Sequence, residues 1–318
     1  MRRIHLFIIC LILCVQSNAF IDIIFTVKNL STNDHLKSNF LTMISSLFEH
    51  TNIDQLRLHI IGDRFSHEYV NNTLRTLSYS STIDLLNIDD LAVKYQQLIL
   101  PLIKQFSSNH TYYKDPLFFF SLFLHRILPS NISRIIMLDI DLRFEHDIQD
   151  LYELFHEFNS TQIIGIAREN QPVYRHLLWS YRQENPQTDV GSAPPHGLPG
   201  LNSGVLLLDL DKLRQSILFN SYLEHPNLIE RLIEKYHFKH THLGDQDFYT
   251  LLSFEYRDLF YFLPCYWNRQ LCIWWKNKGY DDVWNEYYNC NNDESIYLYH
   301  GNCQTAIPKK LIKKSAEL

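Results

Sequence analysis

Apolar residues along the chain follow two alternating patterns. Continuous runs rich in β-branched residues predict buried strands, and apolar residues at helical spacing predict helices. Strands are predicted at 20–29, 56–63, 82–88 and 133–141, and helices at 34–50, 66–77 and 117–128. Strands that alternate with helices indicate βαβ units, so we predict an α/β fold with a mixed, mainly parallel sheet flanked by helices. No linker-like or repeated segment interrupts the pattern, so residues 20–318 are predicted to form a single domain.

Two aspartates end the fourth predicted strand, in the stretch RIIMLDIDLRF (134–144). Residues i and i+2 of a strand point to the same side, so the carboxylates of Asp139 and Asp141 can converge on one ligand. Two like charges that close repel each other unless they share a cation or a proton. Mg²⁺ or Mn²⁺ is the simplest such cation. Because these metals usually complete their shells with phosphates, the pair predicts a phosphorylated substrate.

Three other interpretations of this stretch are open. It could be a polar strand end without a function. It could hold the nucleophile of a phosphatase, although that class places its motif on the first strand and follows it with Thr or Val. It could belong to a glycosidase, although the two carboxylates of such enzymes stand about 5 to 9 Å apart. The position at the carboxyl end of a strand in an α/β sheet, where ligands bind, favours the metal site.

Three later segments add candidate binding residues. Segment 197–214 has a glycine and proline loop before a strand, segment 242–252 begins a helix, and segment 296–303 is a short apolar strand that ends in a histidine and a glycine. Glycine lets backbone approach a ligand, asparagine binds sugar hydroxyls, and histidine is an ordinary third metal ligand beside two carboxylates. The alternatives are a simple turn, a helix cap made by Asp245 and a structural histidine. The candidates are Asn202, Ser203, Gly204, Asp245, Gln246, Asp247 and His300.

The composition limits the class of protein. The chain has 318 residues, of which 46% are hydrophobic and 14% aromatic, so it can form a large core. The net charge of −6 and the mixing of charges leave no broad basic surface, so no nucleic-acid partner is expected. One basic cluster, PKKLIKK at 308–314, is predicted to be a solvated end.

The N-terminal segment 1–19 has the layout of a signal peptide. Two arginines precede an apolar stretch at 6–15, and small residues follow at Ser17 and Ala19. Because a membrane span needs about 20 apolar residues, we expect cleavage after Ala19, with a short signal anchor as the alternative. Contact with a membrane is expected only through this segment, if it is not cleaved.

Sequons and cysteines agree with a secretory compartment. The chain has five N-x-S/T sequons, and four of its cysteines fall within one C-terminal part at about 260–308, where oxidising conditions would join them in two disulfides. A zinc site is the alternative, although no C-x-x-C spacing is present. The sequons are at Asn29, Asn71, Asn109, Asn131 and Asn159, and the cysteines are Cys265, Cys272, Cys290 and Cys303.

In order along the chain, the D-I-D, N-S-G-V, G-D-Q-D and H-G-N elements resemble those of glycosyltransferase family 8, over about residues 20–308. The resemblance implies a Rossmann-like GT-A fold, a nucleotide-sugar donor, retention of configuration and dependence on Mn²⁺, with Mg²⁺ as the alternative. The tail LYHGNCQTAIP, the four cysteines and the Trp274-Trp275 pair are most similar to members that transfer xylose from UDP-xylose. Those members extend xylose-glucose glycans on EGF-like repeats, such as those of Notch, through an α-1,3 bond.

The resemblance also implies roles for individual residues. The metal ligands would be Asp139, Asp141 and His300, the acceptor groove would contain Trp274 and Trp275, and the disulfides would join Cys265 to Cys290 and Cys272 to Cys303. The catalytic residue would be Gln246, with Asp245 and Asp247 in the same block. The donor would contact Thr26, Val27, Lys28, Asn29, Asp139, Asn202, Ser203, Gly204, Gly301 and Asn302.

One departure from the family concerns the residues after the metal histidine. Many members continue with a Lys-Pro-Trp that contacts the diphosphate, whereas this chain has Cys303 to Pro308. The departure puts a lysine role in doubt, although Lys309 or Lys310 could substitute. The implied mechanism is front-face attack, in which the departing phosphate oxygen takes the acceptor proton and Gln246 steadies the oxocarbenium-like sugar. Because no general base is needed, none is assigned.

Rival interpretations within and outside the family stay open. The donor could be UDP-glucose or UDP-galactose, or the chain could be a glucoside xylosyltransferase that acts one step earlier. From a different class, it could be a lumenal carbohydrate-binding protein that has lost catalysis. The expected location is the lumen or membrane of the endoplasmic reticulum, with the final SAEL only faintly similar to a retrieval signal.

Overall fold

The computed structural model describes residues 20–107, 112–238, 243–290 and 295–308. The expected leader at 1–19, the sequon at Asn109 and the substitute lysines Lys309 and Lys310 lie outside these residues. Within the described part of the chain, no helix is both long enough and apolar enough to cross a bilayer.

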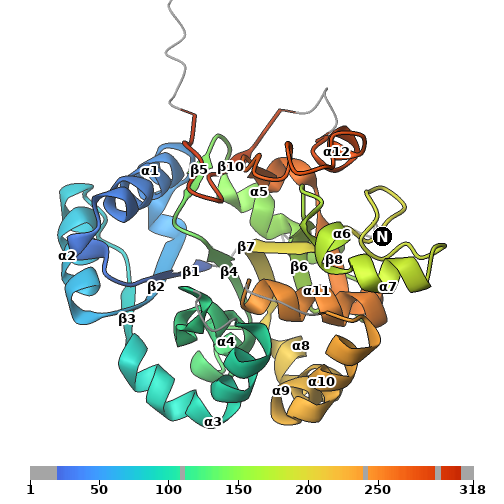
Figure 1. Cartoon of the computed structure of the whole chain (residues 1–318). Coiled ribbons are helices and arrows are strands. Elements are labelled where there is room, and N and C mark those ends of the chain that lie inside the picture. The colour runs from blue at the N-terminus through green and yellow to red at the C-terminus, as the bar shows by residue number, and fades with distance from the viewer. Residues whose placement is uncertain (1–19, 108–111, 239–242, 291–294, 309–318) are drawn as a thin grey trace, which may run out of the picture.

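A seven-stranded mixed sheet forms the centre of the molecule. In spatial order its strands are β3 (Ile83–Asn87), β2 (Leu56–Gly62), β1 (Ile21–Val27), β4 (Arg134–Leu138), β7 (Leu201–Asp209), β6 (Ile164–Arg168) and β8 (Phe260–Leu263) (Figure 1). The first four are parallel, β7 runs antiparallel to both of its neighbours, and β8 is parallel to β6. The predicted α/β fold with a mixed, mainly parallel sheet is confirmed.

Alternate residues of β1 face two hydrophobic cores, one on each side of the sheet. Ile23 and Phe25 face the first core, and Ile24 faces the second. Burial on both faces explains why these strands are continuous apolar runs. Helices that contribute to the first core are α1 (Asp34–His50), α2 (Arg64–Thr76) and α5 (Ile148–Glu153). Helices that contribute to the second are α3 (Ile88–Phe106), α6 (Val173–Leu177), α8 (Leu210–Gln215), α9 (Ile217–Glu224), α10 (Pro226–Lys235) and α11 (Asp245–Glu255).

A second, smaller sheet carries the C-terminal part of the chain. Its strands are β5 (Leu142–Phe144), β10 (Leu298–His300) and β9 (Arg269–Gln270), with β10 in the middle, antiparallel to β5 and parallel to β9. Disulfides join Cys265 to Cys290 and Cys272 to Cys303, which is the pairing that the resemblance implies. Two further short helices are α7 (Trp179–Glu184) and α12 (Trp284–Tyr287).

The segment predicted as one helix at 117–128 differs from that prediction. Residues Pro116–Phe123 form a three-ten helix, and only Leu124–Ile127 (α4) is α-helical. Three-ten helices of this length are uncommon. Phe119 and Phe120 are fully buried, so packing in the core overrides the local preference for an α-helix.

Two strand boundaries near the candidate site also differ from prediction. β4 ends at Leu138, so Asp139 and Asp141 follow the strand. Their carboxylates come together because the chain bends here, and not because alternate residues of a strand point to the same side. β7 begins at Leu201, so Asn202 to Gly204 lie inside a strand and not in the turn before it.

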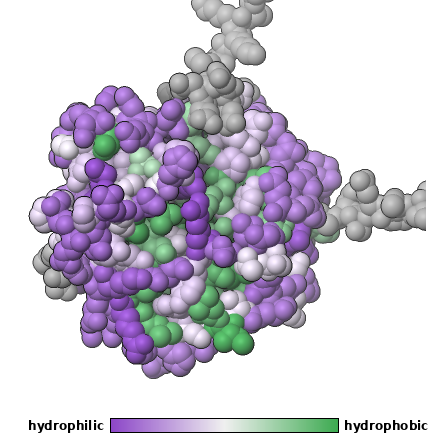
Figure 2. Space-filling view, turned by 90° about the vertical axis from the view of Figure 1, so that its right-hand side faces the viewer, coloured by the Kyte–Doolittle hydropathy of each residue, from purple (hydrophilic) through white to green (hydrophobic). Residues whose placement is uncertain are grey.

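The exposed apolar residues are distributed over many elements of the surface. Figure 2 shows one face, which is mostly hydrophilic, with smaller hydrophobic areas among the hydrophilic residues. Among the sequon asparagines that the structure describes, Asn29, Asn131 and Asn159 are exposed and Asn71 is partly exposed. These four side chains therefore lie where an attached glycan would reach solvent. The most exposed apolar residues are Phe65, Val93, Trp179, Ile217 and Trp274.

Candidate active site

The candidate residues meet at the carboxyl ends of β1 and β4. The chain runs outward from β1 to β2 and β3 and then returns to add β4 on the other side of β1, so this edge is a topological switch point. Open α/β sheets bind ligands at such points. Asp139 and Asp141 follow β4, and β10 ends at His300, so two separate sheets bring these three residues to one place.

Asp139, Asp141 and His300 form a cluster that can hold a metal ion. One candidate ligand atom from each lies within 4.8 Å of the others. The Nε2 atom of His300 is 3.5 Å from Asp139 Oδ2 and 3.4 Å from Asp141 Oδ1. The imidazole is buried, whereas the aspartate side chains remain 50% and 24% exposed, so a ligand can reach the cluster from solvent. Two carboxylates and an imidazole with one open side fit Mn²⁺ or Mg²⁺ with a phosphate as partner.

Gly204 makes room for the metal ligands. A Cβ atom at this position would lie 2.3 Å from Cε1 and 2.7 Å from Nδ1 of His300, and 3.0 Å from Asp139 Oδ2. The Gly204 carbonyl also accepts a hydrogen bond from the Asp139 backbone N–H at 2.9 Å. The sequence predicted close approach of a ligand to this glycine. In the structure, the groups that approach it are the chain's own histidine and aspartate.

The two carboxylates determine the protonation of His300 when no metal is bound. Burial alone lowers the pKa of a histidine, but here the Asp141 charge and hydrogen bonds to both carboxylates outweigh burial and raise the pKa of His300 to about 10. Burial of Asp141 likewise favours its neutral form, but the His300 charge outweighs it and holds the pKa of Asp141 below its usual value. Without a metal, the positive charge of the His300 imidazolium balances the charge of the carboxylates, and a metal that binds here must displace one proton from the imidazolium.

We expect Mn²⁺ affinity to rise with pH. Because the pKa of His300 lies near 10 and the metal needs a neutral imidazole, binding at any lower pH releases a proton. One released proton corresponds to a dissociation constant that falls about tenfold per pH unit. Titration of the protein with Mn²⁺ at pH 6, 7 and 8, followed by electron paramagnetic resonance of the free ion, measures this slope. A pH-independent dissociation constant would contradict the protonation argument.

Asp245 is the first residue of α11 and does not cap it. Gly244, with a φ of 63°, occupies the N-cap position, so the predicted cap made by Asp245 is wrong. A capping side chain must come from the residue before the first helical one. The Asp245 carboxylate accepts hydrogen bonds from the hydroxyls of Ser121 and, at 3.0 Å, Ser203. Burial and the nearby Asp139 charge raise the pKa of Asp245 to about 7.

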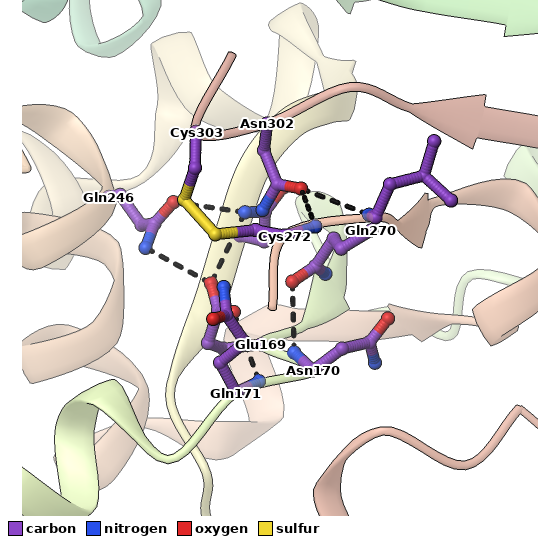
Figure 3. The surroundings of a disulfide bond; sticks show 10 residues. Glu169, Asn170, Gln171, Gln246, Gln270, Cys272, Asn302 and Cys303 are labelled. Atoms are coloured by element: carbon purple, nitrogen blue, oxygen red, sulfur yellow. Dashed lines mark hydrogen bonds between the residues drawn. A yellow bond between two sulfur atoms is a disulfide. The ribbon is translucent and has the colours of Figure 1, made fainter. Parts of the chain in front are cut away.

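Gln246 belongs to a network of buried polar groups. Its Nε2 donates to Glu169 Oε2 at 3.4 Å and to the Tyr174 hydroxyl at 3.2 Å, and its Oε1 accepts from Asn202 Nδ2 at 3.3 Å. Figure 3 shows the side chains of Gln246 and Glu169 directed toward each other. Glu169 is buried, and burial raises the pKa of its carboxyl to about 7.

Asp247, predicted as part of the catalytic block, is fully buried. Its Oδ1 accepts from the Tyr174 hydroxyl at 2.9 Å, and its Oδ2 accepts from the Leu243 backbone N–H at 3.0 Å. Because the Tyr174 hydroxyl also accepts from Gln246, Asp247 is joined to the Gln246 network through Tyr174. Its part in catalysis stays a prediction.

We expect Asp247→Ala to destabilise the protein by about 2 to 4 kcal/mol, because the Tyr174 hydroxyl and the Leu243 N–H would lose a buried partner. Urea unfolding followed by circular dichroism measures the loss. Asp258→Ala, in a three-ten helix where the aspartate is exposed, is the matched control and should change stability by less than about 0.5 kcal/mol. Wild-type stability in Asp247→Ala would contradict this role.

The end of β1 and the two residues after it, which are predicted to bind the nucleotide, are held by contacts with other elements. Val27 is buried, so it offers a ligand only backbone. Lys28 is partly exposed and forms an ion pair with Asp115. Asn29 has a left-handed φ of 58°, and its backbone N–H donates to Asp63 Oδ2 at 2.7 Å. These contacts fix the strand end at the switch point.

Residues that follow His300 fasten its loop to the segments next to β5 and β9. The Gly301 N–H donates to the Asp141 carbonyl at 2.7 Å. The Asn302 Oδ1 accepts from the backbone N–H groups of residues 271 and 272 at 3.0 and 2.9 Å, and the second of these is the cysteine bonded to Cys303 (Figure 3). The side-chain oxygen of Asn302 therefore fastens this loop. The predicted contact with the nucleotide sugar would have to use the amide nitrogen of Asn302.

Comparison with known proteins agrees with the motifs and the geometry. The sequence model of glycosyl transferase family 8 matches residues 30–300. This chain belongs to glycosyltransferase family 8. The match includes the three residues of the metal cluster and the whole Gln246 network described above.

Among members of the family, xyloside xylosyltransferase 1 of Mus musculus and of Homo sapiens are each 45% identical over 260 residues, covering 80% of this chain and 65% of theirs. The aligned chain thus spans slightly less than two thirds of these relatives. The crystal structure of mouse xyloside xylosyltransferase 1 in its apo form has a TM-score of 0.86 at 41% identity, covering 91% of this chain and 100% of that chain. The galactosyltransferase LgtC has a TM-score of 0.55 at 15% identity, covering 88% and 86%, which is a likeness of fold alone.

The two tryptophans that the family resemblance places in the acceptor groove differ in exposure. Trp274 is 64% exposed, and its ring lies 4.5 Å from Lys278 Nζ. Trp275 packs against His176 and Tyr280, with ring centroids 4.8 and 5.8 Å apart. Trp274 therefore has exposed surface on which a ligand can stack, whereas Trp275 packs against its aromatic neighbours. Their role in acceptor binding stays a prediction.

Two buried residues of the site carry no sequence motif. Glu169 follows β6, and Asn268 follows the short three-ten helix Cys265–Trp267. The signal that could have found Glu169 is its place at the carboxyl end of a strand parallel to β4. Asn268 has no comparable signal, because it is a single polar residue outside helices and strands, between the aromatic Trp267 and the charged Arg269.

Proposed function

We propose that this chain is a retaining glycosyltransferase that transfers xylose from UDP-xylose to a xylose-glucose glycan on EGF-like repeats and forms an α-1,3 bond. The proposal is carried by the likeness to mouse xyloside xylosyltransferase 1, at 41% identity over 91% of the chain, in a protein whose Asp139, Asp141 and His300 can hold a divalent metal. A nucleotide diphosphate is the ligand that such a metal prefers as its remaining partner.

In this proposal Asp139, Asp141 and His300 hold Mn²⁺ beside the donor diphosphate. The metal supplies positive charge that stabilises UDP as the glycosidic bond breaks. Hydrogen bonds from the hydroxyls of Ser203 and Ser121 fix the Asp245 carboxylate beside the metal cluster. The strand end at Thr26 to Asn29 lies at the same edge and is proposed to bind the uridine.

Gln246 is proposed to face the anomeric carbon. Its amide is fixed by Glu169, Tyr174 and Asn202, and its Oε1 has a second lone pair that can stabilise the positive charge of the sugar. The acceptor hydroxyl attacks from the face that UDP leaves, its oxygen forms the new bond to the anomeric carbon, and its proton passes to the departing phosphate oxygen. No side chain needs to accept a proton.

Donor turnover with a panel of nucleotide sugars tests the proposal. We expect hydrolysis and transfer with UDP-xylose and Mn²⁺, and at least about tenfold lower kcat/KM with UDP-glucose or UDP-galactose. An EGF repeat that carries xylose-glucose should accept xylose, and one that carries glucose alone should not. A preference for a hexose donor or for the glucose acceptor would favour the rival transferases, and no turnover with any donor would favour a carbohydrate-binding protein.

We also propose that the protein works in the lumen of the endoplasmic reticulum. The proposal is supported by the leader-like segment 1–19 and by the two disulfides. Expression of the full chain in animal cells, followed by endoglycosidase H digestion, should give a sensitive, reticulum-type glycoform. A protein that is unglycosylated and found in the cytosol would contradict this location.

A further inference from the structure

A buried amide, Asn268, connects the metal histidine to the proposed sugar site. Its Oδ1 lies 3.0 Å from His300 Nδ1, and its Nδ2 donates to Asn202 Oδ1 at 2.9 Å. Asn202 in turn donates through Nδ2 to Glu169 Oε2 at 3.2 Å and to Gln246 Oε1 at 3.3 Å. One chain of hydrogen bonds therefore runs from the metal ligand to the Gln246 network, and Asn268 has no exposed surface along it.

The direction of this chain is fixed by groups that cannot be reversed. The Gly204 backbone N–H donates to Asn202 Oδ1 at 3.2 Å, so that atom must be the amide oxygen, and Nδ2 of Asn202 faces the Glu169 carboxylate. Asn268 must then present its Nδ2 to Asn202 and its Oδ1 to the imidazole. An amide oxygen accepts only from a protonated ring nitrogen. His300 therefore carries a proton on Nδ1 in every state, and its Nε2 is the atom directed at Asp139 and Asp141.

Asn268 is itself held firmly. It follows the buried Trp267, and its backbone N–H donates to the Cys265 carbonyl at 3.0 Å. Cys265 is joined to Cys290, so the segment before Asn268 is anchored covalently. A side chain fixed from both ends can hold the imidazole plane and tautomer without reorganising.

We propose that Asn268 is a positioning residue that directs the His300 Nε2 lone pair at the metal and links metal binding to the orientation of Asn202. The inference rests on the metal site of the proposed function, because it gives that site its second layer of hydrogen bonds. Partners of this kind typically account for about 10- to 100-fold in metal affinity. Asn268 does not contact the metal or the donor, so its effect passes through His300 and Asn202.

Two substitutions separate the two links. Asn268→Ala removes both, so we expect the Mn²⁺ dissociation constant of the donor-free protein to rise at least about tenfold. Asn268→Asp keeps an acceptor for His300 Nδ1–H but places an oxygen against Asn202 Oδ1. We expect it to bind Mn²⁺ within about threefold of wild type and to bind UDP-xylose at least about tenfold more weakly. Both constants are measured on the full chain, Mn²⁺ by paramagnetic resonance and UDP-xylose by calorimetry with saturating Mn²⁺.

Asn220→Ala is the matched control. Asn220 Oδ1 lies 3.0 Å from Nε2 of another buried histidine, His125, on the α4 and α9 side of the molecule. Removing this amide should lower stability and leave Mn²⁺ affinity unchanged. An Asn268→Ala protein that is folded and binds Mn²⁺ like wild type would overturn the proposal, and so would an Asn268→Asp protein that loses Mn²⁺ affinity.

The control and the second variant keep the test decisive. If Asn268→Ala does not fold, Asn268→Asp alone decides, because intact Mn²⁺ binding with weakened UDP-xylose binding supports the proposal and lost Mn²⁺ binding overturns it. Failure of the proposed function looks different. In that case Asp139→Asn would leave Mn²⁺ binding unchanged, or the wild-type protein would not bind UDP-xylose. The Asn268 variants are compared by their Mn²⁺ affinity, and this measurement needs no sugar donor.

Discussion

Asp139→Asn should reduce sugar transfer by at least about a thousandfold and weaken Mn²⁺ binding at the same time. The substitution keeps the shape of the side chain but removes one negative charge from a cluster in which the ligand atoms lie within 4.8 Å of one another. In the proposed function a bound metal would stabilise the leaving diphosphate, and loss of one electrostatic group in such a site costs about 10²- to 10³-fold by itself. Transfer assays and Mn²⁺ titration on the same preparation measure both effects.

His300→Ala should act in the same way, because the imidazole is the buried member of the cluster. Both variants should keep the wild-type circular dichroism spectrum, since they leave the two hydrophobic cores intact. His156→Ala, at an exposed histidine in the three-ten helix Leu154–Glu157, is the control for His300→Ala. Near-normal turnover in Asp139→Asn or His300→Ala would remove these residues from the metal site.

Gln246→Ala should lower kcat about a hundredfold and leave the Mn²⁺ dissociation constant within about threefold of wild type. The side chain makes three hydrogen bonds, to Glu169, Tyr174 and Asn202, but none to Asp139, Asp141 or His300 among the contacts described. The loss should therefore appear in the chemical step and not in metal binding. Steady-state kinetics with varied UDP-xylose and a separate Mn²⁺ titration distinguish the two.

Gln97→Ala, on the exposed face of α3, is the control for this variant and should change neither constant. If Gln246→Ala raised KM with an unchanged kcat, Gln246 would be a contact of the ground state alone. If it weakened Mn²⁺ binding as much as His300→Ala does, the separation between the metal cluster and the Gln246 network would be wrong.

The sequence predicted the sheet and the cluster for a simple reason. Strands β1, β2 and β4 are buried along most of their length, so each is rich in apolar residues, whereas the edge strand β3 is only partly buried. The residues after the parallel strands meet at one sheet edge. This reasoning placed Asp139 and Asp141 at the ligand edge although it misjudged the end of β4. The shift of three residues at this strand end is invisible in hydrophobicity, because Ile140 continues the apolar pattern through the bend.

Other features depend on contacts that have no local signal. Asp245 looks like a cap because an aspartate precedes an apolar helix, but Gly244 accepts a positive φ and takes that position. Glu169 and Asn268 are single polar residues in ordinary surroundings, and only the fold brings them to Asn202, 33 and 66 residues away in sequence. Long-range hydrogen bonds of this kind cannot be read from spacing along the chain.

The position of His300 has a consequence for how the protein must be made. The chain emerges from the ribosome with both aspartates long before the histidine, and the loop after His300 is fastened by the bond between Cys272 and Cys303. Metal loading is therefore expected to be a late event that follows oxidation of these thiols. Preparations from a reducing bacterial cytosol should contain folded but metal-poor molecules, and they should gain activity on oxidative refolding in the presence of Mn²⁺.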